Sequence, residues 1–356
     1  MDNTWTNEHN PFQSWKVLAW YDRMKAIKNG NFAPPVNIAL DPIQGTPNKK
    51  VCGGHSCNFC MSDLDNSTEA RIPHDVLLSM PSFFSEWGVK SLCIAGHNSD
   101  PLMYDHDVMC EFLKRCHGDG LDVGFVSNGA SYSTKLLGAV ASYCKWSGWS
   151  VNAGFASTYR TITGTDKLHV VVSNMIEASK LGSRVGFKFL ITDDNYREIG
   201  VACGLARNSG ATHFQVRPCE LPKERSDKID VEVVEGQLSL CMDMQEDNFG
   251  VYGVGEKFTA ELTKMTPKRC VASPLGSTWM ADGRVVICPD RRWDRGWTNF
   301  LCDEGLDVVR DMWGGALHKG AIRSIDTDDC IRCTAYRWHE IYENVIEEDN
   351  VDVALI

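Results

Sequence analysis

Short apolar segments alternate with amphipathic helical patterns along residues 36–216 of the 356-residue chain. We expect strands at 36–40, 91–95, 121–126, 149–155, 184–191 and 213–216, and helices at 73–87, 106–117, 134–144, 168–180 and 196–209. Because strands that alternate with helices form parallel sheets through right-handed crossovers, this pattern predicts an α/β fold. About six such units are fewer than the eight of a closed barrel, so we predict a partial, open (β/α)6 barrel.

Three cysteines, Cys52, Cys57 and Cys60, lie close together after the first expected strand. Thiolates on a tight loop that contains glycines are good ligands for soft metals, and for iron–sulfur clusters above all. Three of them can hold three irons of a four-iron cluster and leave the fourth iron open to a small molecule. The alternative is three packed thiols, since free cysteine packs as a small hydrophobe.

Composition excludes several classes of protein. The net charge of −11 disfavours a general nucleic-acid or anionic-membrane binder. The sequence has neither a run of about eighteen apolar residues nor the basic and apolar regions of a signal peptide, so we expect a cytoplasmic protein. Its 15 cysteines are hard to explain as disulfides in a reducing compartment, and metal ligation explains them better.

The C-terminal third differs in composition from the predicted barrel. Residues 266–340 are rich in Cys, Trp, Arg and Asp, and a small loop-rich module of this kind usually needs a metal to stabilise it. A hairpin turn at Asp282-Gly283 would bring Cys270 and Cys288 to one site. The expected organisation is an N-terminal extension (1–40), the barrel (41–230), a connection (231–265), the small module (266–340) and an acidic tail (341–356).

The first cysteine cluster resembles the signature of the radical S-adenosylmethionine (SAM) superfamily, in which three cysteines hold a four-iron cluster. In the family pattern three residues separate the first two cysteines, two separate the second and third, and an aromatic residue precedes the third. Cys57-Asn58-Phe59-Cys60 matches the second half of this pattern. The first gap, residues 53–56, is one residue longer than usual, and its glycines can absorb the insertion.

Further stretches support this resemblance. Residues 94–102 look like the family's Gly-Gly-Glu-Pro segment, which receives the amino group of SAM, and 127–129 is similar to its Thr-Asn-Gly turn. Polar residues, among them Asn195, also follow the ends of later strands. Taken singly, a polar residue in such a place is usually solvated or caps a helix. Taken together, the resemblance implies SAM contacts from Gly96, Ser99, Asp100, Ser127, Asn128, Asn152, Ser157 and Lys188.

The C-terminal cysteines make a second match. The spacing of Cys270, Cys288, Cys330 and Cys333 looks like the twitch domain, the short form of the SPASM domain, which carries one auxiliary [4Fe-4S] cluster. A structural zinc held by the same four thiolates is the rival interpretation. We interpret Cys302 as a spare, packed thiol. The same packing role is expected for Cys93, Cys110, Cys116, Cys144, Cys203 and Cys241.

The resemblance implies an enzyme that reductively cleaves SAM to a 5′-deoxyadenosyl radical, with an electron donor such as flavodoxin or ferredoxin. That radical would abstract a hydrogen from the substrate, leading to oxidation, epimerisation or rearrangement. Epimerisation needs a hydrogen donor, and Cys219 is the weak candidate because it follows an expected strand end.

The substrate class stays open. We favour a small-molecule or nucleotide-like substrate, with polar contacts from Arg217, Glu220, Arg291 and Arg292. The alternative is a peptide-modifying enzyme, which the short N-terminal extension disfavours, because peptide maturases often carry a leader-binding domain. A hypothesis of another class is a zinc-stapled, non-catalytic protein that binds a partner through its Trp-rich C-terminal region.

Overall fold

The computed structural model describes residues 14–46, 48–60, 68–253, 267–271, 273–330 and 333–347. Part of the predicted connection and most of the predicted acidic tail lie outside these residues, as does the start of the N-terminal extension. In the described part of the chain, no helix is both long and apolar enough to cross a membrane.

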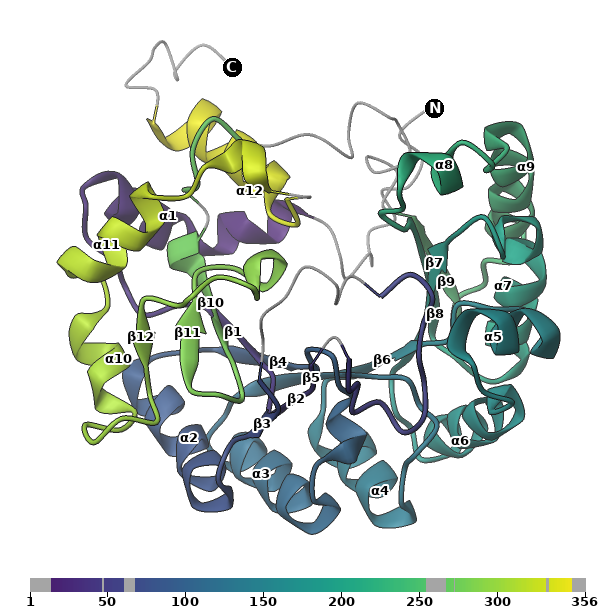
Figure 1. Ribbon diagram of the computed structural model, residues 1–356, viewed down its shortest axis with the longest axis horizontal. Helices are drawn as coiled ribbons and strands as arrows, with labels where there is room; N and C mark the ends of the chain where they lie inside the picture. The colour runs from purple at the N-terminus through teal and green to yellow at the C-terminus, as the bar shows by residue number, and fades with distance from the viewer. Residues whose placement is uncertain are drawn as a thin grey trace.

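Within the described residues, ten strands form one curved sheet in the order β12-β11-β10-β1-β4-β5-β6-β7-β8-β9 (Figure 1). Each adjacent pair from β10 to β9 in this order is parallel, whereas the pairs β10–β11 and β11–β12 are antiparallel. Because β12 and β9 are the two edges, the sheet is an open barrel, as predicted. The strands are β1 (Asn37–Leu40), β4 (Ser91–Ile94), β5 (Asp122–Ser127), β6 (Trp146–Ser150), β7 (Val185–Ile191), β8 (His213–Pro218), β9 (Gly250–Gly253), β10 (Gly276–Trp279), β11 (Arg284–Val286) and β12 (Thr298–Asn299), with a separate pair β2 (Ile43–Gln44) and β3 (Ala70–Arg71).

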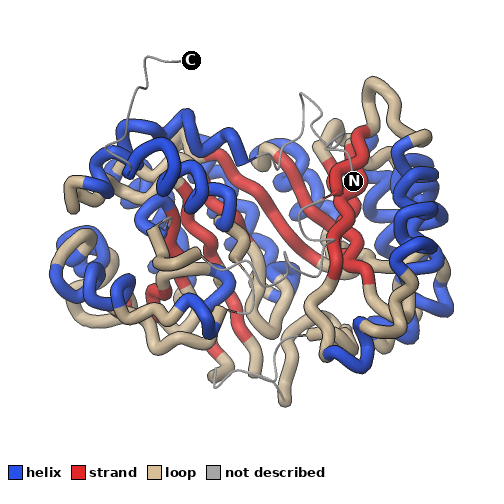
Figure 2. The backbone as a smooth tube through the Cα atoms, turned by 90° about the horizontal axis from the view of Figure 1, so that it is seen from above, coloured by secondary structure: helices blue, strands red, loops and turns tan. Residues whose placement is uncertain are grey.

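Helices lie outside the strands (Figure 2). Several have side-chain caps that fix where they begin, as when Asp105 accepts hydrogen bonds from the N–H groups of Asp107 and Val108. The barrel helices are α2 (His74–Trp87), α3 (His106–Gly118), α4 (Thr134–Tyr143), α5 (Ala156–Thr163), α6 (Leu168–Lys180), α7 (Ile199–Asn208), α8 (Lys223–Ser226) and α9 (Val231–Met242). The other helices are η1 (Ser14–Trp20), α1 (Tyr21–Lys28), α10 (Asp307–Met312), α11 (Ala316–Arg323), α12 (Tyr336–Ile341) and the π-helix η9 (Tyr342–Glu347). Short 3-10 turns are η3 (Pro101–Met103), η4 (Tyr196–Glu198), η6 (Ser273–Leu275), η7 (Pro289–Arg291) and η8 (Thr327–Asp329).

Most expected elements lie within a few residues of their predicted places, one strand is shifted, and several elements were not predicted. The strand expected at 149–155 begins earlier, at Trp146, and ends before Asn152, whose positive φ of 60° breaks the extended backbone. Helix α9 and strand β9 lie within the predicted connection. In β9 two apolar residues stand between glycines, which is too short a run to indicate a strand by pattern.

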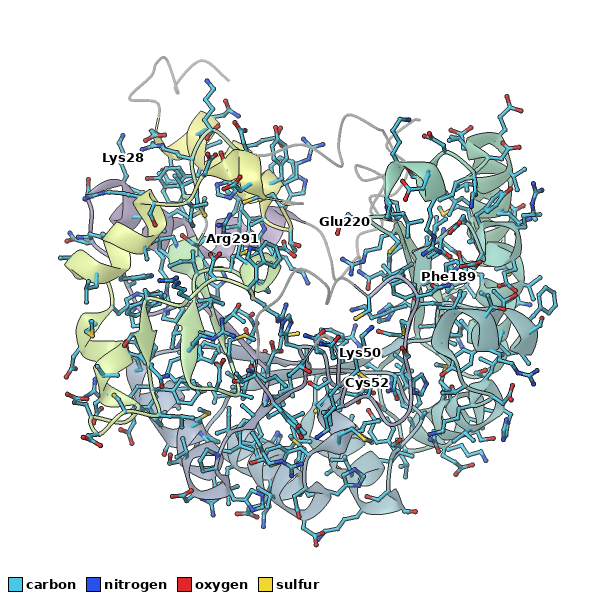
Figure 3. The ribbon with its side chains drawn as sticks, viewed as in Figure 1. Lys28, Lys50, Cys52, Phe189, Glu220 and Arg291 are labelled. Atoms are coloured by element: carbon cyan, nitrogen blue, oxygen red, sulfur yellow. The ribbon has the colours of Figure 1, made fainter. Side chains whose placement is uncertain are left out.

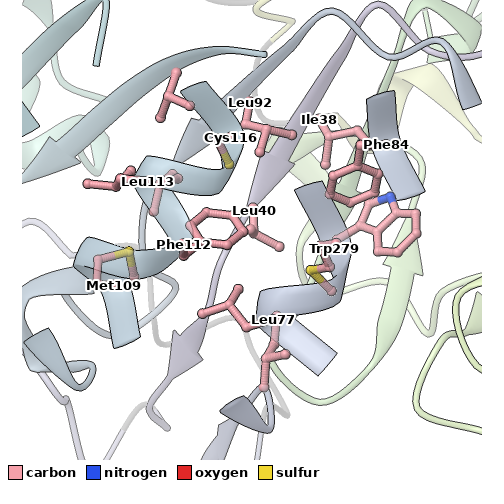
Figure 4. Packing of buried hydrophobic residues seen from close by; sticks show 14 of the residues in the cluster. Ile38, Leu40, Leu77, Phe84, Leu92, Met109, Phe112, Leu113, Cys116 and Trp279 are labelled. Atoms are coloured by element: carbon pink, nitrogen blue, oxygen red, sulfur yellow. The ribbon is translucent and has the colours of Figure 1, made fainter. Parts of the chain in front are cut away.

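The C-terminal strands share the core of the first half of the barrel. Strand β10 pairs with β1 in register from Asn37–Gly276 to Leu40–Trp279. The Trp279 side chain is fully buried, stacks on Phe300 at 4.9 Å between ring centroids and meets the ring of Phe84 in α2 edge-on (Figure 4). A second core lies under β6–β9, and a third joins the N-terminal and C-terminal helices. The predicted small module is therefore packed onto the sheet rather than built on a separate core.

Replacing Trp279 tests this shared core. Trp279→Ala should destabilise the whole protein by about 3–5 kcal/mol, because it leaves a large cavity between α2 and β12. The measurement is the denaturant midpoint, followed by both far-ultraviolet circular dichroism and tryptophan fluorescence. The control is Trp15→Ala, since Trp15 is 62% exposed and its loss should change stability by less than about 0.5 kcal/mol. Equal midpoints for the two variants would contradict the shared core.

Candidate functional site

The cysteine loop lies at the carboxyl end of the parallel strands, on the inside of the curved sheet (Figure 3). It begins with a parallel bridge between Val51 and Ser99. The Val51 N–H donates to the carbonyl of Asn98 at 2.8 Å, and the Asp100 N–H donates to the carbonyl of Val51 at 2.8 Å. The structure thus brings two of the predicted motif stretches side by side.

The turn after β4 keeps its shape through Gly96 and Ser99. A Cβ at Gly96 would lie 2.3 Å from the carbonyl oxygen of Ser99, so no larger residue fits there. The Ser99 hydroxyl donates to the carbonyl of Ile43, which belongs to the segment leading into the cysteine loop. These two predicted SAM contacts therefore shape the turn on which Asp100 is carried.

Asp100 joins the third motif stretch to the other two. Its buried carboxylate accepts hydrogen bonds from the backbone N–H groups of Leu102, at 3.0 Å, and of Asn128. Burial raises the pKa of Asp100 to about 6, against the lowering effect of those two N–H groups. The Asn128 amide donates to the carbonyl of Cys52 at 3.1 Å, and the buried Ser127 hydroxyl accepts from Gly129 N–H within the same turn. All three predicted stretches therefore meet beside Cys52.

The three thiols of the loop lie near enough to affect each other's pKa. Burial, with smaller contributions from the neighbouring Asp100, Cys60 and Cys57, raises the pKa of Cys52 to about 12. Burial likewise raises the pKa of Cys57 to about 11, with Cys60 as the next cause. Metal binding would displace these protons, since the thiolate is the ligand.

The spacing of the thiols bears on which metal centre they fit. Among the described residues, no three His, Cys, Asp or Glu side chains come together closely enough to hold a single metal ion. In a four-iron cluster each cysteine binds a different iron, so its sulfurs stand further apart than those around one zinc. A donor set of three thiols on one loop, within reach of each other's charge, fits a cluster of this kind.

Helix α5, which the sequence did not predict, supports the loop from the other side. The N–H groups of Ser56 and Asn58 donate to the carbonyls of Thr163 and Ile162 at 2.8 and 3.0 Å. Lys167, just beyond the helix, donates to the carbonyl of Gly53 at 2.8 Å. The β-branched residues near the end of α5 weaken its helical pattern. The signal for the helix was the glycine that ends it, Gly164, at a φ of 73°.

A charged network holds the far end of the loop, and the sequence analysis missed it too. The Arg225 guanidinium donates to the carbonyl of Asn58 at 2.9 Å, to Asp193 at 2.6 and 2.8 Å and to Asp194 at 2.9 Å. The Asn58 amide donates to Asp194 at 2.9 Å. Burial alone would raise the pKa of Asp193. The hydrogen bonds and positive charge of Arg225 outweigh this effect, so the pKa of Asp193 lies below its ordinary value.

The remaining predicted SAM contacts lie further round the sheet. The Asn152 side chain accepts from the N–H of Leu190 at 2.8 Å, and Asn195 donates to the Asn152 carbonyl at 2.8 Å. Ser157 is exposed in the first turn of α5, the helix that holds the cysteine loop. Lys188 lies on β7, partly buried, and it lowers the pKa of Cys93 from across the sheet, although burial dominates and raises that pKa. As contacts to SAM these residues stay predictions.

The four C-terminal cysteines of the prediction line one cavity of about 210 Å³. Burial raises the pKa of Cys333 to about 12, with contributions from Cys270 and Cys330. The Cys288 pKa is raised well above its ordinary value by burial and then by Asp290, Cys270 and Cys333. Four thiols that affect each other's pKa around one cavity suit an auxiliary cluster.

An arginine and a backbone N–H point at this second group of thiols. Arg291 donates to the Cys330 sulfur at 3.5 Å and pairs with Asp294 at 2.8 Å. The Asp290 N–H donates to the Cys288 sulfur at 3.4 Å. Such donors stabilise thiolates and the negative charge of a bound cluster.

The other singled-out residues separate into three groups. Cys110, Cys116, Cys203 and Cys241 are buried and Cys93 and Cys144 partly buried, as expected for packing, but Cys302 is exposed in a turn rather than packed. Cys219 follows β8, where its N–H donates to the Ile191 carbonyl at 3.0 Å, and it lies near enough to raise the pKa of Arg225. Arg292 is committed to a buried ion pair with Asp41, so it does not point freely at a substrate, and Glu220 is partly buried just after β8.

The chain shares its fold with two proteins of known structure. SuiB from Streptococcus suis superposes with a TM-score of 0.64 at 16% identity, over 87% of this chain and 73% of SuiB. SuiB bound to the precursor peptide SuiA gives 0.62 at 15% identity, over 91% and 75%. The protein anSMEcpe with bound AdoMet and Cp18Cys peptide gives 0.59 at 11% identity, over 87% and 96%. These likenesses confirm the partial, open barrel that the sequence predicts. No protein-family model and no curated protein sequence matches the chain.

Removing Arg225 should loosen the loop. Arg225→Ala leaves the carboxylate of Asp193, which is 10% exposed, without its main partner, so the free energy of unfolding should fall by about 2 kcal/mol at pH 7. The control is Lys180→Ala, which breaks an exposed pair with Glu177 and should cost less than about 0.5 kcal/mol.

The same pair predicts a pH dependence. Because the pKa of Asp193 is lowered by folding, its stabilisation is present above about pH 4 and is lost as the pH falls through the folded pKa. The difference in stability between wild type and Arg225→Ala should therefore shrink below pH 4. A difference that stays constant down to pH 2 would mean that the ion pair is not its source.

Proposed function

We propose that this protein is a radical SAM enzyme with two iron–sulfur clusters. The observation that carries the proposal is the placement of the three-cysteine loop. It lies at the carboxyl end of a partial barrel and is joined by hydrogen bonds to the turns after β4 and β5. The likeness in fold to SuiB and anSMEcpe, both solved with SAM bound, supports the assignment.

The residues that would hold the first cluster are Cys52, Cys57 and Cys60, and SAM would bind beside it. When bound, the cluster would supply the electron for the reductive cleavage of SAM, which is the chemistry that starts hydrogen abstraction from a substrate. The protein positions these groups and keeps water away. Asp100 and Asn128 brace the loop at Cys52, and Arg225 braces it at Asn58. Such bracing matters because the abstracted hydrogen must lie close to the radical carbon.

For the second site we propose an auxiliary cluster on Cys270, Cys288, Cys330 and Cys333. The shared cavity and the donors from Arg291 and Asp290 support it. A cluster there would accept an electron from the substrate or hold the substrate in place. The electron donor that we propose for the first cluster is a flavodoxin or a ferredoxin.

For the substrate we propose a peptide, in place of the small or nucleotide-like molecule that the sequence favoured. SuiB is solved with the precursor peptide SuiA, and anSMEcpe with the Cp18Cys peptide.

Reconstitution under anaerobic conditions tests the two clusters. The wild-type protein should take up about eight irons, four for each cluster, and yield 5′-deoxyadenosine with SAM and dithionite. Replacing Cys52, Cys57 and Cys60 together by Ala should leave about four irons and abolish SAM cleavage. Replacing the other four cysteines should also leave about four. Retention of zinc without 5′-deoxyadenosine would support the non-catalytic, zinc-stapled alternative instead.

Asp100→Asn tests the turn that joins the motifs. An amide can accept at only one of the two positions where the carboxylate now accepts backbone N–H groups, so its NH₂ would face the N–H of Leu102 or Asn128. We expect SAM to bind about tenfold more weakly, with the iron content unchanged. The control is Asp105→Asn, because Asp105 also accepts two backbone N–H groups but caps α3 at the surface. Unchanged SAM affinity in Asp100→Asn would contradict the role of this turn.

A further inference from the structure

The first gap of the cysteine loop contains a histidine that is more buried than the cysteines around it. His55 is 5% exposed, whereas Cys52, Cys57 and Cys60 are only partly buried. A polar ring at this depth needs hydrogen-bond partners for both nitrogens. His55 has them, at 3.0 Å from Nδ1 to the carbonyl of Cys52 and at 2.8 Å from Nε2 to the hydroxyl of Tyr159.

The partners determine the direction of these hydrogen bonds. A carbonyl can only accept, so Nδ1 carries the proton and donates to Cys52. In the neutral ring Nε2 then accepts from the Tyr159 hydroxyl, which is the donor. The two rings also meet edge to face, with centroids 5.9 Å apart. His55 therefore connects the backbone of the first cysteine to a fully buried tyrosine in α5.

The carbonyl of Cys52 is held from two sides. His55 Nδ1 donates to it from within the loop, and the Asn128 amide donates to it at 3.1 Å from the end of β5. Gly53 and Gly54 follow, both at positive φ, so nothing in their own side chains restrains the chain between Cys52 and His55. The position of Cys52 relative to Cys57 thus depends on contacts that His55 makes.

We propose that His55 and Tyr159 form a positioning pair for the first cluster. The pair holds residues 53–56, which separate Cys52 from Cys57, against α5. His55 anchors the first half of the gap through its ring. The backbone bonds of Ser56 and Asn58 to the end of α5 anchor the second half. This inference rests on the proposed function, because it assumes that the three cysteines bind a cluster. It adds that contacts with α5 help to fix the shape of this four-residue gap.

The test is the pair of variants Tyr159→Phe and His55→Leu, each reconstituted as the full-length protein. Tyr159→Phe removes only the hydroxyl that donates to His55. We expect the iron of the first cluster to be bound about tenfold more weakly, as for other residues that orient a metal ligand. The electron paramagnetic resonance signal of that cluster should also lose its change on adding SAM. The second cluster should keep its iron and its signal.

The matched control is Tyr104→Phe. Tyr104 is also buried, and its hydroxyl donates to the carbonyl of Ile72 at 2.6 Å, away from the cysteine loop. It should lower the melting temperature about as much as Tyr159→Phe does, while both clusters and the response to SAM stay as in the wild type. His55→Asn should restore part of the first signal, because its amide can still donate to the carbonyl of Cys52.

Other outcomes separate the pair from the proposed function. If Tyr159→Phe and His55→Leu load the first cluster and respond to SAM as the wild type does, the positioning role is wrong and the proposed function stands. If the variants lose both clusters in equal measure, the pair has a general role in stability, and the proposed positioning role is likewise wrong. A wild-type protein that binds no cluster at all would instead refute the proposed function.

Discussion

Two backbone hydrogen bonds between Val51 and the turn at 98–100 hold the cysteine loop to the sheet, and the arrangement of the site depends on them. The described part of the loop has little regular structure, so contacts with neighbouring segments determine its shape. The turn after β4 holds its start, α5 after β6 holds its middle, and Arg225 after β8 holds its end. Because these supports follow different strands, the curvature of the whole sheet determines where the three thiols meet.

The second group of thiols is placed relative to the first through β1. The cysteine loop follows β1 along the chain, and β10 pairs with β1 in parallel just before the hairpin that leads to Cys288. Asp41, at the end of β1, forms a buried ion pair with Arg292, beside the second cavity. A buried pair of this kind is costly to break from one side only. The pairing of β1 with β10 and this ion pair thus link the two groups of thiols.

The sequence predicted the regular parts of this structure well, because apolar periodicity reports directly on which residues pack. It also located both groups of cysteines and the turns at Asp100 and Asn128, since their spacing is local. It missed α5, whose β-branched end obscures the helical pattern, and therefore missed the support that His55 and Tyr159 give the loop. The network of Arg225 with Asp193 and Asn58 joins three separate segments, so no pattern along the chain could indicate it.

The pairing of β1 with β10 has a consequence for how the protein folds. Strand β1 pairs on one side with β10, which lies far along the chain. During synthesis that edge of β1 therefore stays unpaired until residues 276–279 have left the ribosome. The side chains of Ile38 and Leu40 stay incompletely buried until then, because Trp279 and its neighbours complete the core around them. Non-local pairing of this kind is slow to form, and open edges promote aggregation. Completing the edge of β1 is therefore a late step, and until then the nascent barrel is the form most in need of a chaperone.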